Sequence, residues 1–402
     1  MKVKTGLLLV LFCVIGQSGS ALDVYLIRHG ETVGNTTGDY SPINQATFSP
    51  RGLEQVAAVP EKLKGFRFDC VMVSPTWRTQ QTILPFLKAT GQKAEIWPEV
   101  EEVDCGITGD VVPSASVNRG TAVEIVEGAQ DLIACRDEVS SRRYAPTSRE
   151  EGVRQLMLAV DLVKSRFGGS DKSVLIVTHS CAGGRLMELF LGLKPSGRFS
   201  PKNATLSHLR QTEDGRFELV SLNEKPLTDL DRFLLTDEDV PPVEGFVGLG
   251  KKWLIQGGDR EDFKNAGFND QSWATTTVPG GWEKDALPDY DGTAWYRIHF
   301  QVTEEMRAKW PRTGSMTLIL GAVDDADETF LNGQKIGSSG EFPPAKVTAW
   351  DQPRFYMFDV GLLAATNVLA VRVSDWGGGG GIWRGPVVIG PESALPAANP
   401  SP

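Results

Sequence analysis

The chain contains 402 residues, of which 41% are hydrophobic and 23% are charged, and its mass is 43.8 kDa. This composition is typical of soluble globular proteins, and the length is sufficient for two domains. The formal net charge of -10 excludes a generally basic surface and therefore disfavours nucleic acid as a partner.

The first 21 residues differ in composition from the rest of the chain. Lys2 and Lys4 precede the apolar run 7–16, and small residues follow up to Ala21. This order is typical of a secretory signal peptide, so we expect residues 1–21 to be removed and the mature protein to be secreted or periplasmic. The apolar run is about half the ~20 residues that a membrane-spanning helix needs. No other stretch of the sequence is long enough, and we expect no membrane span in the mature chain.

The apolar run 23–27 predicts a buried strand, and it leads into LIRHGETVGN at 26–35. An Arg-His-Gly turn at the end of a strand brings a guanidinium, an imidazole and free backbone N–H groups together, which suits a phosphoryl group. Arg28 and His29 are therefore candidate site residues. An isolated Arg-His pair is equally compatible with a core histidine beside a surface arginine.

A second buried strand is predicted at 68–73, followed by SPTWRTQQT. Ser74 and Pro75 are the residue types expected at the N-cap and the first position of a helix, and Arg78 lies about one turn further on. A helix N-terminus favours an anion, and Arg78 adds a full positive charge there.

Two adjacent carboxylates follow a third predicted strand at 94–97. Glu101 and Glu102 lie in VEEVDCG at 100–106, and a carboxylic acid at this place could donate a proton. The next segment, 107–148, has no clear periodicity. Four arginines near its end could hold a second anionic group of a substrate or form a solvated basic face, namely Arg136, Arg142, Arg143 and Arg149.

A helix is predicted at 150–167, and a continuous apolar strand at 173–178 leads directly to His179. A closing strand pair is predicted at 205–210 and 217–222. Because ligands of open α/β sheets bind at the carboxyl ends of the strands, the candidate residues that follow these strands should meet at one edge of the sheet.

The sequence around these residues resembles the signature motifs of the histidine phosphatase superfamily, which has the phosphoglycerate mutase-like fold. The resemblance implies a three-layer α/β/α domain over residues 22–235, with a lid formed by 107–148. It also implies Glu102, rather than Glu101, as the proton donor. The implied catalytic residues are His29 as nucleophile, Glu102, His179, Arg28 and Arg78, and the implied phosphate-binding residues are Arg28, Asn35, Arg78 and His179.

The implied chemistry is phosphoryl transfer through a covalent phosphohistidine, without a cofactor or a catalytic metal. We expect a small phosphorylated substrate, such as a sugar phosphate, and water as the acceptor, because a secreted protein has no evident supply of the phosphorylated primer that a mutase needs. Two alternatives remain open. One is a phosphomutase, and the other is a carbohydrate-binding or scaffold protein whose phosphatase domain is inactive.

Two chemical features of the mature chain depend on the compartment. Its four cysteines could form two disulfides in any of three pairings or stay as free thiols, and they are Cys70, Cys105, Cys135 and Cys181. The sequons that begin at Asn35 and Asn203 are meaningful only in a eukaryotic secretory route.

After a linker predicted at 236–250, which is acidic and contains two consecutive prolines, the pattern changes to alternation of apolar and polar residues. Residues 251–392 are therefore predicted to form an antiparallel β domain with a hairpin at Asn332-Gly333, followed by a tail at 393–402.

This region resembles the galactose-binding-like β-sandwich of glycoside hydrolases and sialate O-acetylesterases, which implies a jelly roll and a glycan as a candidate partner. Trp350, Trp376 and Trp383 could form a stacking surface for a sugar or pack in the core. Three acids at a predicted turn could hold calcium but are more often solvated, so no metal ligand is assigned; they are Asp324, Asp325 and Asp327.

Overall fold

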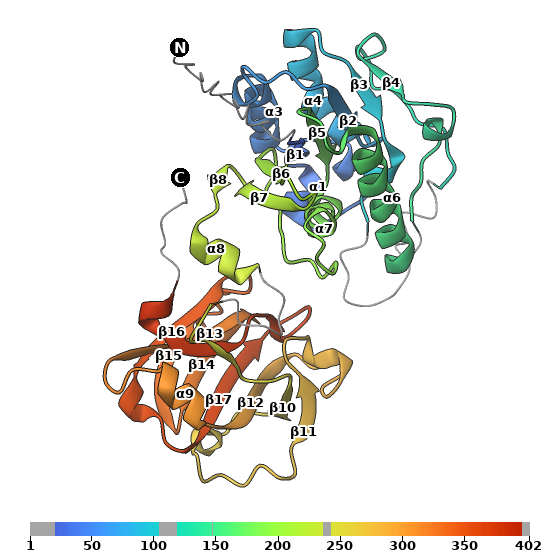
Figure 1. Cartoon of the computed structure of the whole chain (residues 1–402). Coiled ribbons are helices and arrows are strands. Elements are labelled where there is room, and N and C mark those ends of the chain that lie inside the picture. The colour runs from blue at the N-terminus through green and yellow to red at the C-terminus, as the bar shows by residue number, and fades with distance from the viewer. Residues whose placement is uncertain (1–20, 104–118, 147, 236–242, 396–402) are drawn as a thin grey trace, which may run out of the picture. The chain divides into compact units, whose positions relative to one another are not determined.

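The computed structural model describes residues 21–103, 119–146, 148–235 and 243–395. It contains two units, one ending at Lys225 and the other beginning at Pro226 (Figure 1). The predicted signal peptide lies outside the described residues except for Ala21. Within the described ranges, no helix is both long and apolar enough to cross a membrane.

The first unit is built on an eight-stranded sheet with the order β4-β3-β2-β5-β1-β6-β7-β8. The strands from β4 to β1 in this order are parallel, and β6 and β7 continue the sheet in antiparallel pairing. The carboxyl ends of the parallel strands therefore share one edge. The strands are β1 (Asp23–Arg28), β2 (Cys70–Val73), β3 (Ala94–Ile96), β4 (Ile133–Cys135), β5 (Ser173–Thr178), β6 (Leu206–Gln211), β7 (Phe217–Leu222) and β8 (Lys225–Pro226).

Both faces of this sheet are covered. The helices are α1 (Val33–Thr37), α2 (Pro42–Gln45), α3 (Pro50–Lys62), α4 (Trp77–Thr90), α6 (Arg149–Phe167) and α7 (Ser180–Phe190), with short 3-10 turns η1 (Pro98–Val100) and η2 (Val139–Ser141). Leu175 and Val177 of β5 pack in one cluster with side chains of α3 and α4. Val174 and Ile176 point to the opposite face and are fully buried as well. The mixed α/β prediction for this unit is confirmed.

The helix α4 begins later than the Ser-Pro signal predicts. Its N-cap is Thr76, and Ser74 lies before the helix. The hydroxyl of Ser74 instead forms a 2.8 Å hydrogen bond with Nε2 of His179. The prediction of Ser74 as an N-cap is wrong, because this side chain is committed to a residue 105 positions away. Arg78 still lies in the first turn of α4.

The second unit is rich in β-strands, which form a six-stranded sheet (β11-β10-β12-β17-β14-β15) and a five-stranded sheet (β16-β13-β19-β9, with β18 paired to β13). Tyr296 and Val371 of the first sheet share one hydrophobic core with Leu318 and Tyr356 of the second. The jelly-roll connectivity stays a prediction. The strands are β9 (Val247–Gly248), β10 (Lys252–Gly257), β11 (Ala274–Thr277), β12 (Gly292–Gln301), β13 (Ser315–Asp324), β14 (Ala326–Leu331), β15 (Gln334–Ser339), β16 (Pro353–Asp359), β17 (Thr366–Asp375), β18 (Gly381–Arg384) and β19 (Val388–Pro391).

The hairpin between β14 and β15 forms at the predicted turn. Asn332 and Gly333 both have positive φ angles, of 52° and 87°, as the expected two-residue turn requires. Two short helices complete the unit, α8 (Asp229–Leu234) and α9 (Glu304–Lys309).

The segment around the predicted linker contributes to the second unit. Its residues 247 and 248 form β9, which pairs with β19. Phe233 of α8 packs with Phe246, Ile319 and Val388, although the sequence analysis places residue 233 in the first domain.

Candidate active site

Two histidines meet at the carboxyl edge of the parallel strands. β1 and β5 are neighbours in a register that pairs Arg28 with Thr178, so the residues that follow them, His29 and His179, are adjacent. The backbone N–H of His29 donates to the carbonyl of Thr178 at 3.0 Å. The two imidazole centroids are 5.3 Å apart. This is the juxtaposition that the strand ends predict.

The environment of His29 leaves one ring nitrogen with a lone pair. Nδ1 lies 2.7 Å from the carbonyl oxygen of Gly30. A carbonyl only accepts hydrogen bonds, so Nδ1 carries the proton and Nε2 is unprotonated in the neutral ring. Burial, followed by the charges of Arg78 and Arg28, holds the pKa of His29 well below its usual range. His29 is therefore a neutral imidazole at neutral pH, and its Nε2 carries a free lone pair.

His179 is neutral for the same reasons. Burial and the nearby Arg78 hold its pKa well below 6.5, with smaller effects of His29, Arg28 and Arg143. Its Nε2 pairs with Ser74, and its Nδ1 is buried without a hydrogen-bond partner among the described residues. Nδ1 is thus available to contact a bound group.

Two guanidinium groups supply the positive charge of the site. Arg28 donates from Nη1 to the carbonyl of Pro201 at 3.0 Å, and Arg78 donates from Nη1 to the side chain of Gln45 at 3.1 Å. Burial lowers the pKa of Arg78 to about 10, against the stabilising effect of Glu102. Among the described residues, neither guanidinium donates a hydrogen bond to a carboxylate, so both retain donors for an anionic ligand.

The structure separates the two adjacent carboxylates. Glu102 faces Arg28 and Arg78, and its Oε1 accepts hydrogen bonds from the backbone N–H groups of Ala182 at 2.9 Å and Val103 at 3.2 Å. Burial nevertheless raises its pKa. Glu101 instead forms an ion pair with Arg143. The arrangement around Glu102 fits a proton donor and acceptor, as the resemblance implies.

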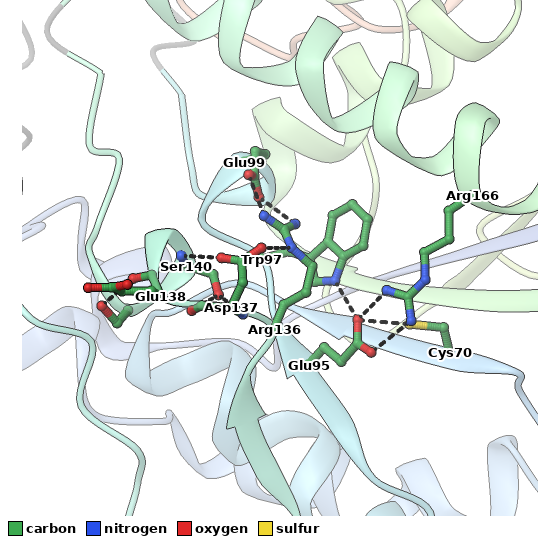
Figure 2. A network of polar contacts seen from close by, with 10 residues as sticks. Cys70, Glu95, Trp97, Glu99, Arg136, Asp137, Glu138, Ser140 and Arg166 are labelled. Atoms are coloured by element: carbon green, nitrogen blue, oxygen red, sulfur yellow. Dashed lines mark hydrogen bonds and ion pairs between the residues drawn. The ribbon is translucent and has the colours of Figure 1, made fainter.

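A polar network holds the segment that carries Glu102 (Figure 2). Arg136 donates to both oxygens of Glu99, at 2.9 and 3.2 Å, and lies 4.4 Å from the ring centroid of Trp97. Glu95 joins the indole N–H of Trp97 to Arg166 of α6. This network fixes the entry to η1, directly before the carboxylate.

Further contacts hold the same segment from the sheet and from α6. Nε2 of the fully buried Gln155 lies between 3.1 and 3.3 Å from the carbonyl oxygens of Pro98, Glu99 and Glu101. The hydroxyl of Thr178 donates to the carbonyl of Val100 at 2.8 Å. No sequence pattern predicts these contacts of Gln155 or the contact of Ser74 with His179. In each case the partner is distant in sequence, and only the tertiary fold brings it near.

The four arginines considered for a second anion have different surroundings. Arg136 is held by Glu99 and Asp137, and Arg142 donates to the carbonyl of Gly120, so both are structural. Arg149 begins α6. Arg143 is the one of the four whose charge acts on Arg78 and His179.

Asn35 contributes to the loop behind the nucleophile. Its Oδ1 accepts the backbone N–H of Thr32, which caps α1, and also lies 3.3 Å from Nδ2 of Asn203. Nδ2 of Asn203 donates to the carbonyl of His29 at 2.9 Å. The sequence marks Asn203 only as the start of a sequon, whereas in the structure its amide nitrogen holds the backbone of His29.

The cysteines are only partly described. Cys70 and Cys135 are free thiols, and Cys181 at the start of α7 is disulfide-bonded. Cys105, residue 147 and the first part of the lid expected at 107–148, residues 107–118, lie outside the described residues. The part of that segment that is described contains β4 and η2.

Comparison with known proteins gives the following similarities. A probable phosphoglycerate mutase, GpmB, of Yersinia enterocolitica is 26% identical over 196 residues, which cover 48% of this chain and 86% of that protein. The adenosylcobalamin/alpha-ribazole phosphatase of Escherichia coli K12 is 36% identical over 83 residues, which cover 21% of this chain and 41% of that protein.

Solved structures with similarity include the alpha-ribazole phosphatase of Shigella flexneri, at a TM-score of 0.37 and 20% identity, covering 51% of this chain and 98% of that one. A β-glucuronidase of Bacteroides uniformis has a TM-score of 0.28 and 22% identity, covering 36% of this chain and 17% of that one.

The family model of the histidine phosphatase superfamily (branch 1) matches residues 24–225, which is half of the chain. The matched range begins in β1 and includes the histidines, arginines and carboxylate that meet at the edge of the sheet. The chain therefore belongs to the histidine phosphatase superfamily.

Proposed function

We propose that the protein is a secreted phosphomonoesterase that hydrolyses small organic phosphate esters through a phosphohistidine at His29. The observation that carries this proposal is the hydrogen bond from Nδ1 of His29 to Gly30, which leaves Nε2 as a lone-pair donor beside two guanidinium groups. The composition of residues 1–21 supports secretion.

The first step transfers the phosphoryl group to the protein. Nε2 of His29 attacks phosphorus, the bond from phosphorus to the ester oxygen breaks, and the leaving alkoxide takes the proton of Glu102. Arg28, Arg78 and Nδ1 of His179 lie around the phosphoryl oxygens and stabilise their charge as the group moves. Gly30 stabilises the positive charge that develops on the imidazole, because its carbonyl accepts the Nδ1 proton.

The second step returns the site to its starting state. The ionised Glu102 takes a proton from a water molecule, the water oxygen attacks phosphorus, and the bond from phosphorus to Nε2 breaks. Inorganic phosphate leaves, and Glu102 is again protonated for the next turnover. One carboxyl group therefore serves both steps, which its raised pKa favours.

Arg143 supports a substrate with a second anionic group, such as a sugar bisphosphate or a phosphorylated acid. Its guanidinium is largely buried and its charge acts on both Arg78 and His179. Burial and Arg78 lower its pKa to about 10, so an anion bound near Arg143 would relieve the repulsion between the two guanidinium groups.

The similar proteins include one named as a mutase and one named as a phosphatase. The next experiment therefore asks whether water or a second hydroxyl accepts the phosphoryl group. The experiment offers the full chain a panel of sugar, inositol and nucleotide phosphates and identifies the products. We expect release of inorganic phosphate without a phosphorylated primer. Transfer of the phosphoryl group to a second hydroxyl, with no inorganic phosphate released, would favour the mutase instead.

The pH dependence tests the role of Glu102. The first step needs His29 unprotonated and Glu102 protonated. The pKa of His29 is held low, so activity persists at mildly acidic pH, and the raised pKa of Glu102 places the loss of activity on the alkaline side. Glu102→Gln should lower kcat/KM, which reports the first step, by about 10²-fold on an alkyl phosphate and by less on 4-nitrophenyl phosphate, whose leaving group needs no proton.

The neighbouring variant Glu101→Gln provides the comparison for that measurement. In this variant, activity should still fall at alkaline pH and should still depend on the leaving group. The reason is that Glu101 pairs with Arg143 and not with the reacting oxygen. If Glu101→Gln abolishes the loss of activity at alkaline pH and Glu102→Gln retains it, then Glu101 is the proton donor and Glu102 is not.

We also propose that the second unit binds carbohydrate through the exposed Trp350 and the half-buried Trp383 beside it. The rings of Trp350 and Trp383 are stacked at 5.8 Å, and the indole N–H of Trp383 donates to the carbonyl of Trp350 at 2.9 Å. Trp350 is exposed, so the indole pair offers a fixed apolar surface of the kind on which sugar rings stack.

Affinity electrophoresis in gels that contain galactan, xylan or mannan tests this second proposal. Trp350→Ala should weaken retardation by about tenfold, because it removes most of the exposed stacking surface. Met357→Ala, which removes another exposed apolar side chain of this unit, is the control. Equal behaviour of the two variants on every polysaccharide would contradict carbohydrate binding at Trp350.

A further inference from the structure

Three carboxylates of the second unit converge where two strands of different sheets end. Asp324 is the last residue of β13, Asp325 follows it before β14, and Asp375 is the last residue of β17. Each residue offers one carboxylate oxygen, and the three oxygens lie within 4.8 Å of one another. Asp325 and Asp375 are only 6% and 1% exposed, whereas Asp324 is half-buried.

The acidic group in the structure differs by one residue from the group that the sequence suggests. Asp327 does not join it, because Asp327 is buried and accepts hydrogen bonds from Arg354, Tyr356 and Thr329. Asp375, which is distant in sequence, takes its place. The pairing of Ala326 with Ser374 between β14 and β17 brings Asp325 and Asp375 together.

The arginine closest in charge to the three acids is committed to other partners. Arg354 is the positive charge that acts on Asp324, but its Nε is committed to Asp327 at 2.8 Å and its Nη2 to the carbonyl of Val323. Buried carboxylates in this situation are costly unless a positive charge joins them.

A second observation concerns Asp375. Its Oδ1 accepts the backbone N–H of Gly377 at 3.0 Å, whereas its Oδ2 is buried and has no hydrogen-bond partner in the described part of the chain. A Cβ atom at Gly380 would lie 2.8 Å from that oxygen, so a larger residue at 380 would crowd it. The structure therefore holds an unpartnered, buried carboxylate oxygen at the acidic group, next to a glycine.

We propose that Asp324, Asp325 and Asp375 bind a single calcium ion. All three ligands are oxygens, which favours hard divalent cations over zinc. Calcium takes about six to eight oxygen ligands in a flexible geometry, whereas magnesium demands a near-ideal octahedron, so three carboxylates completed by water suit calcium better.

The ion would join parts of the second unit that carry the proposed sugar surface. Asp325 accepts the backbone N–H of Trp376 on Oδ2 at 3.2 Å, and its carbonyl accepts the N–H of Ala349, which precedes Trp350. Fixing Asp325 therefore fixes the backbone next to two of the three tryptophans. The half-exposed Asp324 leaves one side of the ion accessible to water, which would complete its coordination.

Isothermal titration calorimetry tests the proposal on the full chain after dialysis against EDTA. We expect one calcium ion per chain and an affinity for magnesium at least about tenfold lower. Asp324→Asn should weaken calcium binding by at least about tenfold, because affinity depends on the number of charged ligands. Asp351→Asn, which replaces an exposed acid of the same unit, should bind calcium as the unaltered chain does.

Terbium gives an independent readout, because a nearby indole sensitises its luminescence and calcium competes for the same site. We expect tryptophan-excited terbium emission that calcium displaces and that Asp324→Asn lowers. Asp375→Asn should also lower the emission, provided that this variant folds. If it does not fold, Asp324→Asn alone tests the proposal, because Asp324 is only half-buried. Absence of calcium binding at millimolar concentration, or binding that both substitutions leave unchanged, would overturn the proposal.

Discussion

Replacing His29 with alanine should abolish phosphate release, with kcat lower by about 10⁴-fold or more. Removal of a covalent nucleophile is among the most damaging changes to an enzyme, because the remaining groups then act on a water that nothing positions. Steady-state release of phosphate from 4-nitrophenyl phosphate measures the loss. A rapid alkaline quench followed by intact mass measurement should show a phosphorylated protein with the unaltered chain and none with His29→Ala.

The matched control is His208→Gln. His208 is also buried in the first unit, but it pairs with Asp23 and stacks on Tyr25, away from the site. Glutamine can preserve the hydrogen bond to Asp23, so activity per folded molecule should remain. Phosphorylated protein in His29→Ala, or activity within tenfold of the unaltered chain, would rule out His29 as the nucleophile.

Replacing Asp327 with asparagine should lower the free energy of unfolding of the second unit by about 3–5 kcal/mol. The side chains of Asp327 and Arg354 have no exposed area, and Nε of Arg354 lies 2.8 Å from Oδ1 of Asp327. Asparagine would leave the guanidinium buried without its counter-charge, which costs far more than the loss of an exposed ion pair. Chemical denaturation monitored by tryptophan fluorescence measures the change.

Two further variants separate the buried charge from other effects of that substitution. Glu305→Gln breaks the exposed pair with Lys309 and should change stability by less than about 0.5 kcal/mol. Replacing both Asp327 and Arg354 with apolar residues should cost less than the sum of the two single changes, because no charge is then left unpaired. If Asp327→Asn lowers the free energy of unfolding by less than about 1 kcal/mol, then water or a rearrangement replaces the lost counter-charge of the Arg354 guanidinium.

Much of the first unit is predictable from local sequence because its long strands are continuous apolar runs. The strands at 23–28 and 173–178 lie where those runs predict them, and a histidine directly follows each strand. β4 was missed because a three-residue strand at the edge of the sheet has too few residues to show a period. Its pairing with β3 depends on contacts that lie far apart in the sequence.

The side chains that support the site were harder to foresee. Ser74 has the sequence signature of an N-cap, yet it bonds His179, because the end of β2 lies beside the end of β5. Gln155 lies within an ordinary helical pattern, and only the packing of α6 against η1 shows that it holds three carbonyl groups. Motifs thus identify the candidate reactive groups, whereas the groups that orient them depend on tertiary contacts.

The acidic group of the second unit shows the same limit. Asp324, Asp325 and Asp327 are close in sequence, but strand alternation and burial commit Asp327 to Arg354. Asp375 joins the other two through the register of β14 and β17, which the sequence does not specify.

The position of Asn203 has a practical consequence for producing the protein. Its amide nitrogen holds the backbone of His29, yet the same atom is the acceptor of a sugar chain in a eukaryotic secretory pathway. Oligosaccharide attached there before folding would replace a hydrogen atom that the loop needs and would place a bulky group behind the nucleophile. A bacterial expression host avoids this modification, and material from yeast or mammalian cells should be enzymatically weaker unless Thr205 is replaced to remove the sequon.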